Sequence, residues 1–132
     1  MDTRRSFAVL GDEKFVSLTT FRRSGERVST PVWVGRDGDT LIVTTPEASG
    51  KVKRLRNSAR VEVRPCNRSG RVEDGMEPVG GVAQIVTDDG TKDRLTGIIR
   101  AKYGFEFRLV MAIERLARSR QARRVILRIT PA

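Results

Sequence analysis

Alternating apolar and polar residues predict six strands, because a strand turns successive side chains to opposite faces. These segments are rich in β-branched and aromatic residues and cover residues 14–21, 27–35, 40–45, 60–66, 79–86 and 124–130. Ser24 with Gly25, and Asp37 with Gly38, would turn the first three strands into hairpins. Pro31 has no N–H to give to a ladder, so its strand is expected to have an open or bulged edge.

A helical period of apolar residues replaces this alternation in three other segments. The first helix begins at Ser49, a natural N-cap, and carries a stripe that would face a core, formed by Val52, Leu55 and Ala59. Gly104 separates the other two helices, whose apolar positions are Leu95, Ile98, Ile99, Phe107, Val110, Met111, Ile113 and Leu116. A short apolar helix or turn is also expected at residues 6–10.

About six antiparallel strands with three helices indicate a mainly β protein of the α+β type, built as a β-barrel. The 132 residues predict a single domain over residues 1–132, long enough to bury about two-thirds of the surface that the unfolded chain exposes. The 38% of hydrophobic and 32% of charged residues are typical of a folded protein rather than a disordered one.

The helix that follows the third predicted strand is strongly basic. Its cations flank the apolar stripe on both sides, at Lys51, Lys53, Arg54, Arg56 and Arg60. A helix N-terminus with free N–H groups and a lysine in its first turn makes a good anion site. A solvated basic face on an amphipathic helix has the same spacing, so the spacing alone leaves both interpretations open.

The net charge of +10 suggests an anionic partner, such as nucleic acid, a membrane surface or a phosphorylated small molecule. The basic residues are 21 Arg and 5 Lys, and they are scattered along the chain. No zinc finger, helix-turn-helix signature or aromatic–basic RNA-binding motif accompanies the charge. A basic nucleic-acid-binding module is therefore a remote alternative, and no specific nucleic-acid partner is expected.

The absence of histidine restricts the possible chemistry more than any other feature of the sequence. It excludes Ser-His-Asp and Cys-His catalysis, His-ligated metals and the usual general base near neutral pH. The single cysteine, Cys66, excludes an internal disulfide and a zinc site made of cysteines, and we expect no metal site. The chemistry of an enzyme with this sequence must come from carboxylates, hydroxyls, Lys or a bound cofactor.

We expect a cytoplasmic protein without a membrane span. No apolar run approaches the roughly 18 residues that span a bilayer. Two arginines near the N-terminus precede an apolar stretch of only five residues, 7–11, which is too short for the core of a signal peptide.

The run FVSLTTFRRSGERVSTPVWVGRDGDTLIVTTPEASGKVKRLRNSARVEV resembles the pyridoxamine 5′-phosphate oxidase-like split β-barrel superfamily, which is FMN-binding-like in fold. More narrowly it resembles the branch that uses the deazaflavin coenzyme F420, as do the later segment KYGFEFR and the closing basic strand. The resemblance implies a homodimer with two cofactor sites at the subunit interface.

By the same resemblance, Lys51 matches a phosphate-binding lysine, and Thr44 and Thr45 match strand-end residues that contact the cofactor's linker. Residues 29–33 match the strand that lines the flat ring. The whole predicted cofactor-binding set is Thr30, Pro31, Val32, Trp33, Thr44, Thr45, Ser49, Gly50, Lys51, Arg54 and Arg56. Arg54 and Arg56 would reach the phosphate or the acidic oligoglutamate tail of the deazaflavin.

The FMN-using oxidases carry an arginine and a lysine for the FMN phosphate where this chain has apolar and hydroxyl residues, at positions 28–34. This departure favours F420 over FMN, which stays the alternative cofactor. The resemblance then implies an F420H2-dependent reductase that transfers a hydride to a conjugated organic substrate, with no catalytic side chain, since the reduced cofactor carries the hydride. The alternative is an FMN-binding protein or a non-catalytic cofactor or haem carrier, and the loop at residues 73–78 does not identify a ligand.

Overall fold

A computed structural model describes residues 7–116 and 123–132 and places seven strands in one antiparallel sheet with the order β2-β1-β5-β6-β7-β4-β3. The strands are β1 (Val16–Phe21), β2 (Arg27–Val32), β3 (Gly35–Asp37), β4 (Thr40–Pro46), β5 (Arg60–Pro65), β6 (Val79–Val86) and β7 (Arg124–Pro131). The helices are α2 (Gly50–Asn57), α3 (Asp89–Tyr103) and α4 (Phe105–Leu116), and a 3-10 turn covers η1 (Val9–Asp12). The prediction of a mainly β half-barrel with three helices is confirmed.

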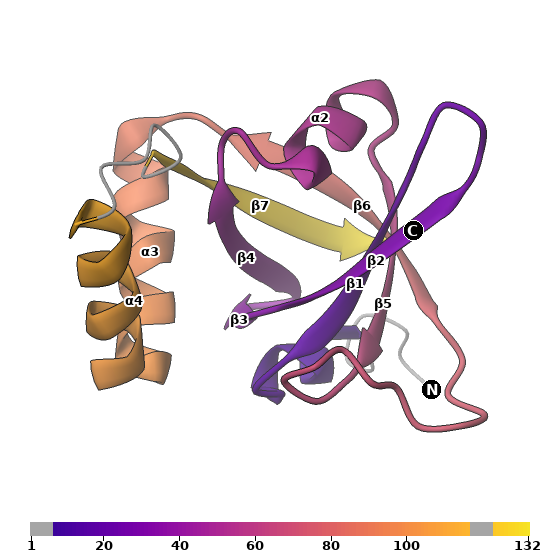
Figure 1. The fold of residues 1–132 in the computed structure, drawn as a ribbon, viewed down its shortest axis with the longest axis horizontal. Helices are drawn as coiled ribbons and strands as arrows, with labels where there is room; N and C mark the ends of the chain where they lie inside the picture. The colour runs from indigo at the N-terminus through magenta and orange to yellow at the C-terminus, as the bar shows by residue number, and fades with distance from the viewer. Residues whose placement is uncertain (1–6, 117–122) are drawn as a thin grey trace.

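The sheet curls on itself, and the helices cover two of its sides (Figure 1). In that view α3 and α4 lie side by side on the left, and α2 lies above the strands, where it contacts β1 and β6. The two edge strands, β2 and β3, follow each other in the chain, so the chain itself joins the two edges of the sheet. None of the helices in the described residues is long and apolar enough to cross a membrane.

Two apolar clusters lie on opposite faces of the sheet, because the strands are buried on both sides. On β4, Leu41 and Val43 point into the barrel with the stripe residues Val52 and Leu55 of α2. Ile42, between them, points outward and packs under α3 and α4 in the second cluster, which contains Ile42, Val86, Leu95, Ile99, Tyr103, Phe107 and Ile126. The buried strands therefore read as nearly continuous apolar runs.

The second predicted strand, residues 27–35, is in fact two strands that pair with different partners. β2 pairs with β1 from Arg27 to Val32, and β3 then pairs with β4 in a hairpin that turns at Gly38, as expected. The chain changes partner at Trp33 and Val34, which lie between the two strands. The prediction of one strand was wrong because apolar alternation continues through a bend that only long-range contacts impose.

Tyr103 and Lys102, at the C-terminal end of α3, hold this bend. The Tyr103 hydroxyl accepts a hydrogen bond from the Val34 N–H at 3.0 Å and donates to the Lys14 carbonyl at 2.6 Å. The Lys102 ammonium donates to three backbone carbonyls, those of Gly11, Glu13 and Val34. Burial raises the pKa of Tyr103 to about 12, so the hydroxyl stays protonated over the whole neutral range.

The basic helix is shorter than the sequence pattern predicts. α2 ends at Asn57, and Ser58 is its extended C-cap. Ala59 is therefore exposed rather than on the buried stripe, and its carbonyl accepts from the Ala83 N–H at 2.8 Å. This hydrogen bond to β6 replaces the last helical turn, so the prediction that Ala59 belongs to the buried stripe was wrong.

We expect Tyr103→Phe to lower the free energy of unfolding by about 1–3 kcal/mol, because the Val34 N–H would be buried without an acceptor. Tyr103→Leu should cost more, because it also removes the ring that Trp33 stacks on, at a centroid distance of 4.4 Å. Urea unfolding followed by circular dichroism measures both. A Tyr103→Phe variant as stable as the native protein would show that the bend does not need the hydroxyl.

Candidate functional site

The barrel is split between one edge of β2 and the C-terminal half of β4. Among the described strands β2 pairs only with β1, and β3 covers β4 only from Thr40 to Ile42. The other half of β4, from Val43 to Pro46, pairs with β7 on its far side only. Two backbone edges without a ladder therefore face the split, and such edges can hydrogen-bond a flat ligand.

A cavity of about 270 Å³ lies at this split, and we call it the slot. It brings together six residues of the predicted cofactor-binding set, Pro31, Val32, Trp33, Thr44, Thr45 and Lys51. It also has four lining residues that the prediction did not include, Phe15, Pro46, Val110 and Arg124. Residues from β2, β4, α2, α4 and β7 meet here although the sequence separates them by up to 109 positions, from Phe15 to Arg124.

The N-terminus of α2 fixes Lys51 at one end of the slot. Ser49 is the N-cap, as predicted, and its hydroxyl accepts from the Val52 N–H at 3.4 Å. The Thr45 hydroxyl, at the end of β4, donates to the same Ser49 oxygen at 3.3 Å. The cap therefore joins the strand end to the helix start, and it sets where the first-turn lysine projects.

Positive charge concentrates around Lys51. Burial lowers the pKa of Lys51, and the nearby guanidinium groups of Arg54 and Arg124 lower it further. None of the carboxylates in the described residues forms an ion pair with Lys51, although eleven ion pairs occur elsewhere. A half-buried ammonium that only cations approach is a site where an anion would be stabilised.

Five of the eleven predicted residues do not line the slot, namely Thr30, the N-cap Ser49, Gly50, Arg54 and Arg56. Arg54 donates to the Thr20 hydroxyl at 2.7 Å and folds back over Gly50, where an added Cβ would lie 2.7 Å from its Nη1. Arg56 is exposed on the outer side of α2. Thr30 lies on β2, and its buried hydroxyl has no hydrogen-bond partner among the described residues. Arg54 thus adds positive charge near Lys51 and anchors α2 to β1, but it does not line the slot.

Arg124 is the one charged residue among the four slot residues that sequence reasoning missed. Its Nε donates to the Thr44 hydroxyl and its Nη2 to the Thr44 carbonyl, both at 3.1 Å, while Nη1 bonds Glu114 at 2.5 Å. The only signal in the sequence was the basic character of the last strand. Nothing in that strand shows that Thr45 and Pro46 of β4 pair with Val125 and Arg124.

Trp33 forms an aromatic wall of the slot, and its ring packs against two aromatic residues of α3 and α4. Its ring stacks on Tyr103 with centroids 4.4 Å apart and an interplanar angle of 14°. Phe107 lies at 6.5 Å from it, in a tilted arrangement. Stacking on a residue that is itself held by hydrogen bonds keeps the indole from rotating, so the wall is rigid.

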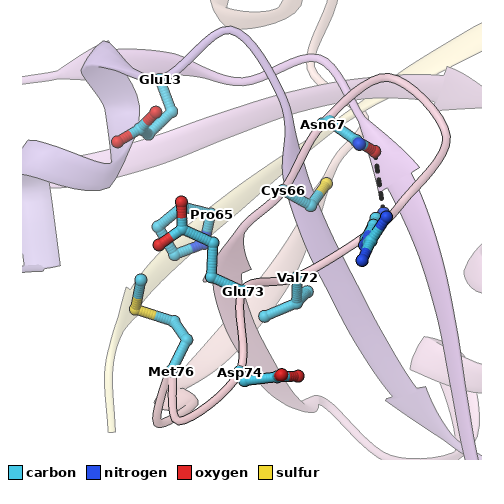
Figure 2. Close-up of a pocket in the computed structure, with 9 residues that line it drawn as sticks. Glu13, Pro65, Cys66, Asn67, Val72, Glu73, Asp74 and Met76 are labelled. Carbon is cyan, nitrogen blue, oxygen red and sulfur yellow. Dashed lines mark hydrogen bonds between the residues drawn. The ribbon is translucent and has the colours of Figure 1, made fainter.

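A larger cavity of about 660 Å³ lies elsewhere, under the loop that follows β5 (Figure 2). Glu13, Glu73 and Asp74 contribute carboxylates to it, with Cys66 and Met76 beside them. Burial raises the pKa of the Cys66 thiol, which makes it a poor nucleophile. Size therefore does not identify the site in this protein, and the slot is the better candidate because its polar groups converge on one end.

The slot can hold a flat apolar group with an anion at one end. Trp33, Val32 and Pro31 offer an apolar surface along β2, and Lys51 with Arg124 offers positive charge at the other side. This is the donor set that a planar cofactor with a phosphate needs, so the residues present fit such a group.

Three solved structures of known description are similar to the chain in fold. A structure described as an F420 reductase is 17% identical, covers 96% of this chain and 93% of its own, and has a TM-score of 0.59. An FAD-binding protein from Mesorhizobium loti is 15% identical, with coverages of 99% and 88% and a TM-score of 0.67. The haem storage protein of Vibrio cholerae is 14% identical, with coverages of 100% and 92% and a TM-score of 0.62.

At these identities the three structures support the fold alone, and they differ in what their descriptions say they bind. A comparison with curated proteins finds no match. The family described as pyridoxamine 5′-phosphate oxidase matches residues 3–132. With this match and the split half-barrel described above, the chain belongs to the pyridoxamine 5′-phosphate oxidase family of split-barrel proteins.

Proposed function

We propose that the protein is an F420-dependent oxidoreductase that transfers a hydride between the reduced deazaflavin and a conjugated organic substrate. One observation carries the proposal: Lys51 lies half-buried, with Arg54 and Arg124 as its charged neighbours, at the end of a slot with an aromatic wall. A phosphate on a flat ring satisfies both features of that slot at once. The absence of histidine is consistent with chemistry that a cofactor supplies.

The bound cofactor would supply the hydride. The protein would bind its phosphate through Lys51 and orient its ring against Trp33, with the open backbone edge of Val32 beside it. The Trp33 ring, stacked on Tyr103, would also exclude water from one side of the ring plane. No side chain is required to move a proton at the slot if solvent protonates the product.

The second candidate function is a cofactor carrier that binds FMN or haem without turnover. The observation that favours it is the range of groups named for proteins of this fold, which includes FAD binding and haem storage. Titration of the purified protein with the deazaflavin, FMN and haem, followed by absorbance and fluorescence, separates the candidates. Tightest binding of the deazaflavin supports the reductase, and tightest binding of FMN or haem supports the carrier.

We further propose a homodimer in which the partner covers the outer stripe of α4. Four apolar residues on this stripe are 48–82% exposed, namely Phe105, Leu109, Ile113 and Leu116. The stripe borders a surface hollow, formed with Leu109 and Val110, that reaches Phe15 and Trp33 at the slot. Continuous apolar surface of this kind is unusual on a monomer, and a second copy that covered it would also enclose the slot.

The binding proposal predicts unequal effects for two neighbouring lysines. Lys51→Gln should lower deazaflavin affinity by roughly 2 kcal/mol, or about thirtyfold, through loss of a charge-assisted contact with the phosphate. Lys53→Gln, an exposed position on the same helix with the same charge change, should cost a small fraction of that. Fluorescence titration at fixed ionic strength measures both, and equal losses would reduce the site to general basic attraction.

The same pair of variants tests how the charge of Lys51 affects the stability of the protein without ligand. The folded-state pKa of Lys51 is lowered, so its charged form destabilises the fold at every pH below that pKa, and the cost is relieved only as the pH rises toward the unfolded value of 10.5. Near neutral pH, Lys51→Gln should therefore raise the thermal midpoint without ligand, whereas Lys53→Gln should not. A lower midpoint for Lys51→Gln would show that the lysine is stabilising and not held for a ligand.

The assembly proposal predicts that Ile113→Glu, on the exposed stripe of α4, converts a dimer into a monomer. Light scattering should give twice the chain mass of 14.8 kDa for the native protein and the single mass for the variant. Val82→Glu places the same charge on another exposed apolar residue, on β6, and should stay dimeric. A monomeric native protein at micromolar concentration would rule out the dimer.

A further inference from the structure

A second cavity lies on the outer side of the sheet, between α3, α4 and β7. It has a volume of about 530 Å³, and we call it the α3–α4 cleft. Thr44 and Arg124 line both the cleft and the slot, so the two cavities adjoin at the Arg124 side chain. The volume lies within the range of about 300–1,000 Å³ that is usual for small-molecule sites.

Positive charge lines this cleft from three elements. The cations are Lys92 and Arg100 on α3, Arg108 and Arg115 on α4, and Arg124 on β7. The one carboxylate in the lining is Glu114, and it is taken up by its bond to Arg124. The lining therefore carries a strong excess of positive charge rather than a set of internal ion pairs.

Three of these guanidinium groups have no carboxylate of their own. Within residues 7–116 and 123–132, none of the carboxylates pairs with Arg100, Arg108 or Arg115, whereas nine other arginines of the described chain do form ion pairs. Arg100 instead lies over the Phe107 ring, 5.6 Å from its centroid. Guanidinium groups gathered around a cavity, with fork-shaped donors free, are suited to bind carboxylate or phosphate.

The inner wall of the cleft is apolar. Phe107 and Ile126 are buried core residues, and Met111 packs beside them half-buried. Methionine adapts to ligands of different shape, and Phe107 offers part of an aromatic surface. A cavity with an apolar wall and a cationic rim selects a molecule that has both an apolar body and negative charges.

We propose that the α3–α4 cleft is a binding site for an organic polyanion with an aromatic or conjugated body. The anionic groups would meet Arg108 and Arg115 at the mouth, and the body would lie on Phe107 and Met111. The site adjoins the slot at Thr44 and Arg124 but does not require the cofactor, so its test does not depend on the proposed function.

Fluorescein is a suitable probe, because it is a flat xanthene with a carboxylate and a phenolate. Fluorescence polarisation of fluorescein with the full chain, without cofactor, should show saturable binding. The rhodamine that has the same ring system, but amino groups in place of the phenolic oxygens, is the matched ligand. Its affinity should be at least about tenfold lower, because the ring system and the carboxylate are kept while the anionic phenolate is replaced by a cationic amine-substituted ring, which leaves no net negative charge.

Two variants locate the binding. Arg108→Gln with Arg115→Gln should weaken fluorescein binding roughly tenfold or more, through loss of two cations at the cleft. Lys53→Gln with Arg56→Gln removes the same charge from exposed positions on α2 and should change affinity less than about twofold. Ala112→Glu places a carboxylate at an exposed position of the cleft and should abolish binding.

Three results would overturn the proposal. The first is the absence of saturable fluorescein binding up to about 1 mM. The second is an equal loss in the α2 double variant, which would reduce the effect to net charge. The third is unchanged binding in Ala112→Glu, which would place the probe elsewhere, such as at Lys51. Circular dichroism of each variant confirms that a loss reflects the site rather than unfolding.

Discussion

The bend at Val34 is the constraint on which the rest of the structure depends. Here the chain passes from β2, at one edge of the sheet, to β3, at the other edge. The Val34 N–H is bound by Tyr103 and the Val34 carbonyl by Lys102, rather than by a neighbouring strand. A free carbonyl and N–H at such a buried corner would cost several kcal/mol. The end of α3 therefore fixes where the chain leaves β2 and how Trp33 is held.

Lys51 at the slot and Lys102 at the bend have opposite effects on the stability of the fold. The Lys102 ammonium donates to three backbone carbonyls and so stabilises the fold. The charged form of Lys51 is instead destabilised by burial and by its neighbours Arg54 and Arg124. Both lysines have a lowered pKa, with burial as the largest cause, yet only Lys102 has hydrogen-bond acceptors among the described residues. Lys102 is therefore a structural cation, and the lack of acceptors at Lys51 supports our proposal that this lysine binds an anionic ligand.

Local patterns in the sequence were enough to predict what depends on neighbouring residues. The cap at Ser49, the hairpin at Gly38 and the break at Gly104 each follow from one residue type, and all three are present. The resemblance added six slot residues, which the fold does gather. Neither source could give the bend at Val34 or the place of Arg124, since both follow from contacts between residues about 70 to 80 positions apart.

The helix α4 shows how one short element can serve several surfaces at once. Its buried side packs Phe107 under the sheet, one flank gives Val110 to the slot, and the other gives Arg108 and Arg115 to the α3–α4 cleft. Its remaining side, with Ile113, is the exposed apolar stripe. These surfaces lie at different angles around the helix axis, so a substitution on one leaves the others intact. The proposed cofactor binding, anion binding and assembly can thus be tested separately, although one helix of 12 residues contributes to all three surfaces.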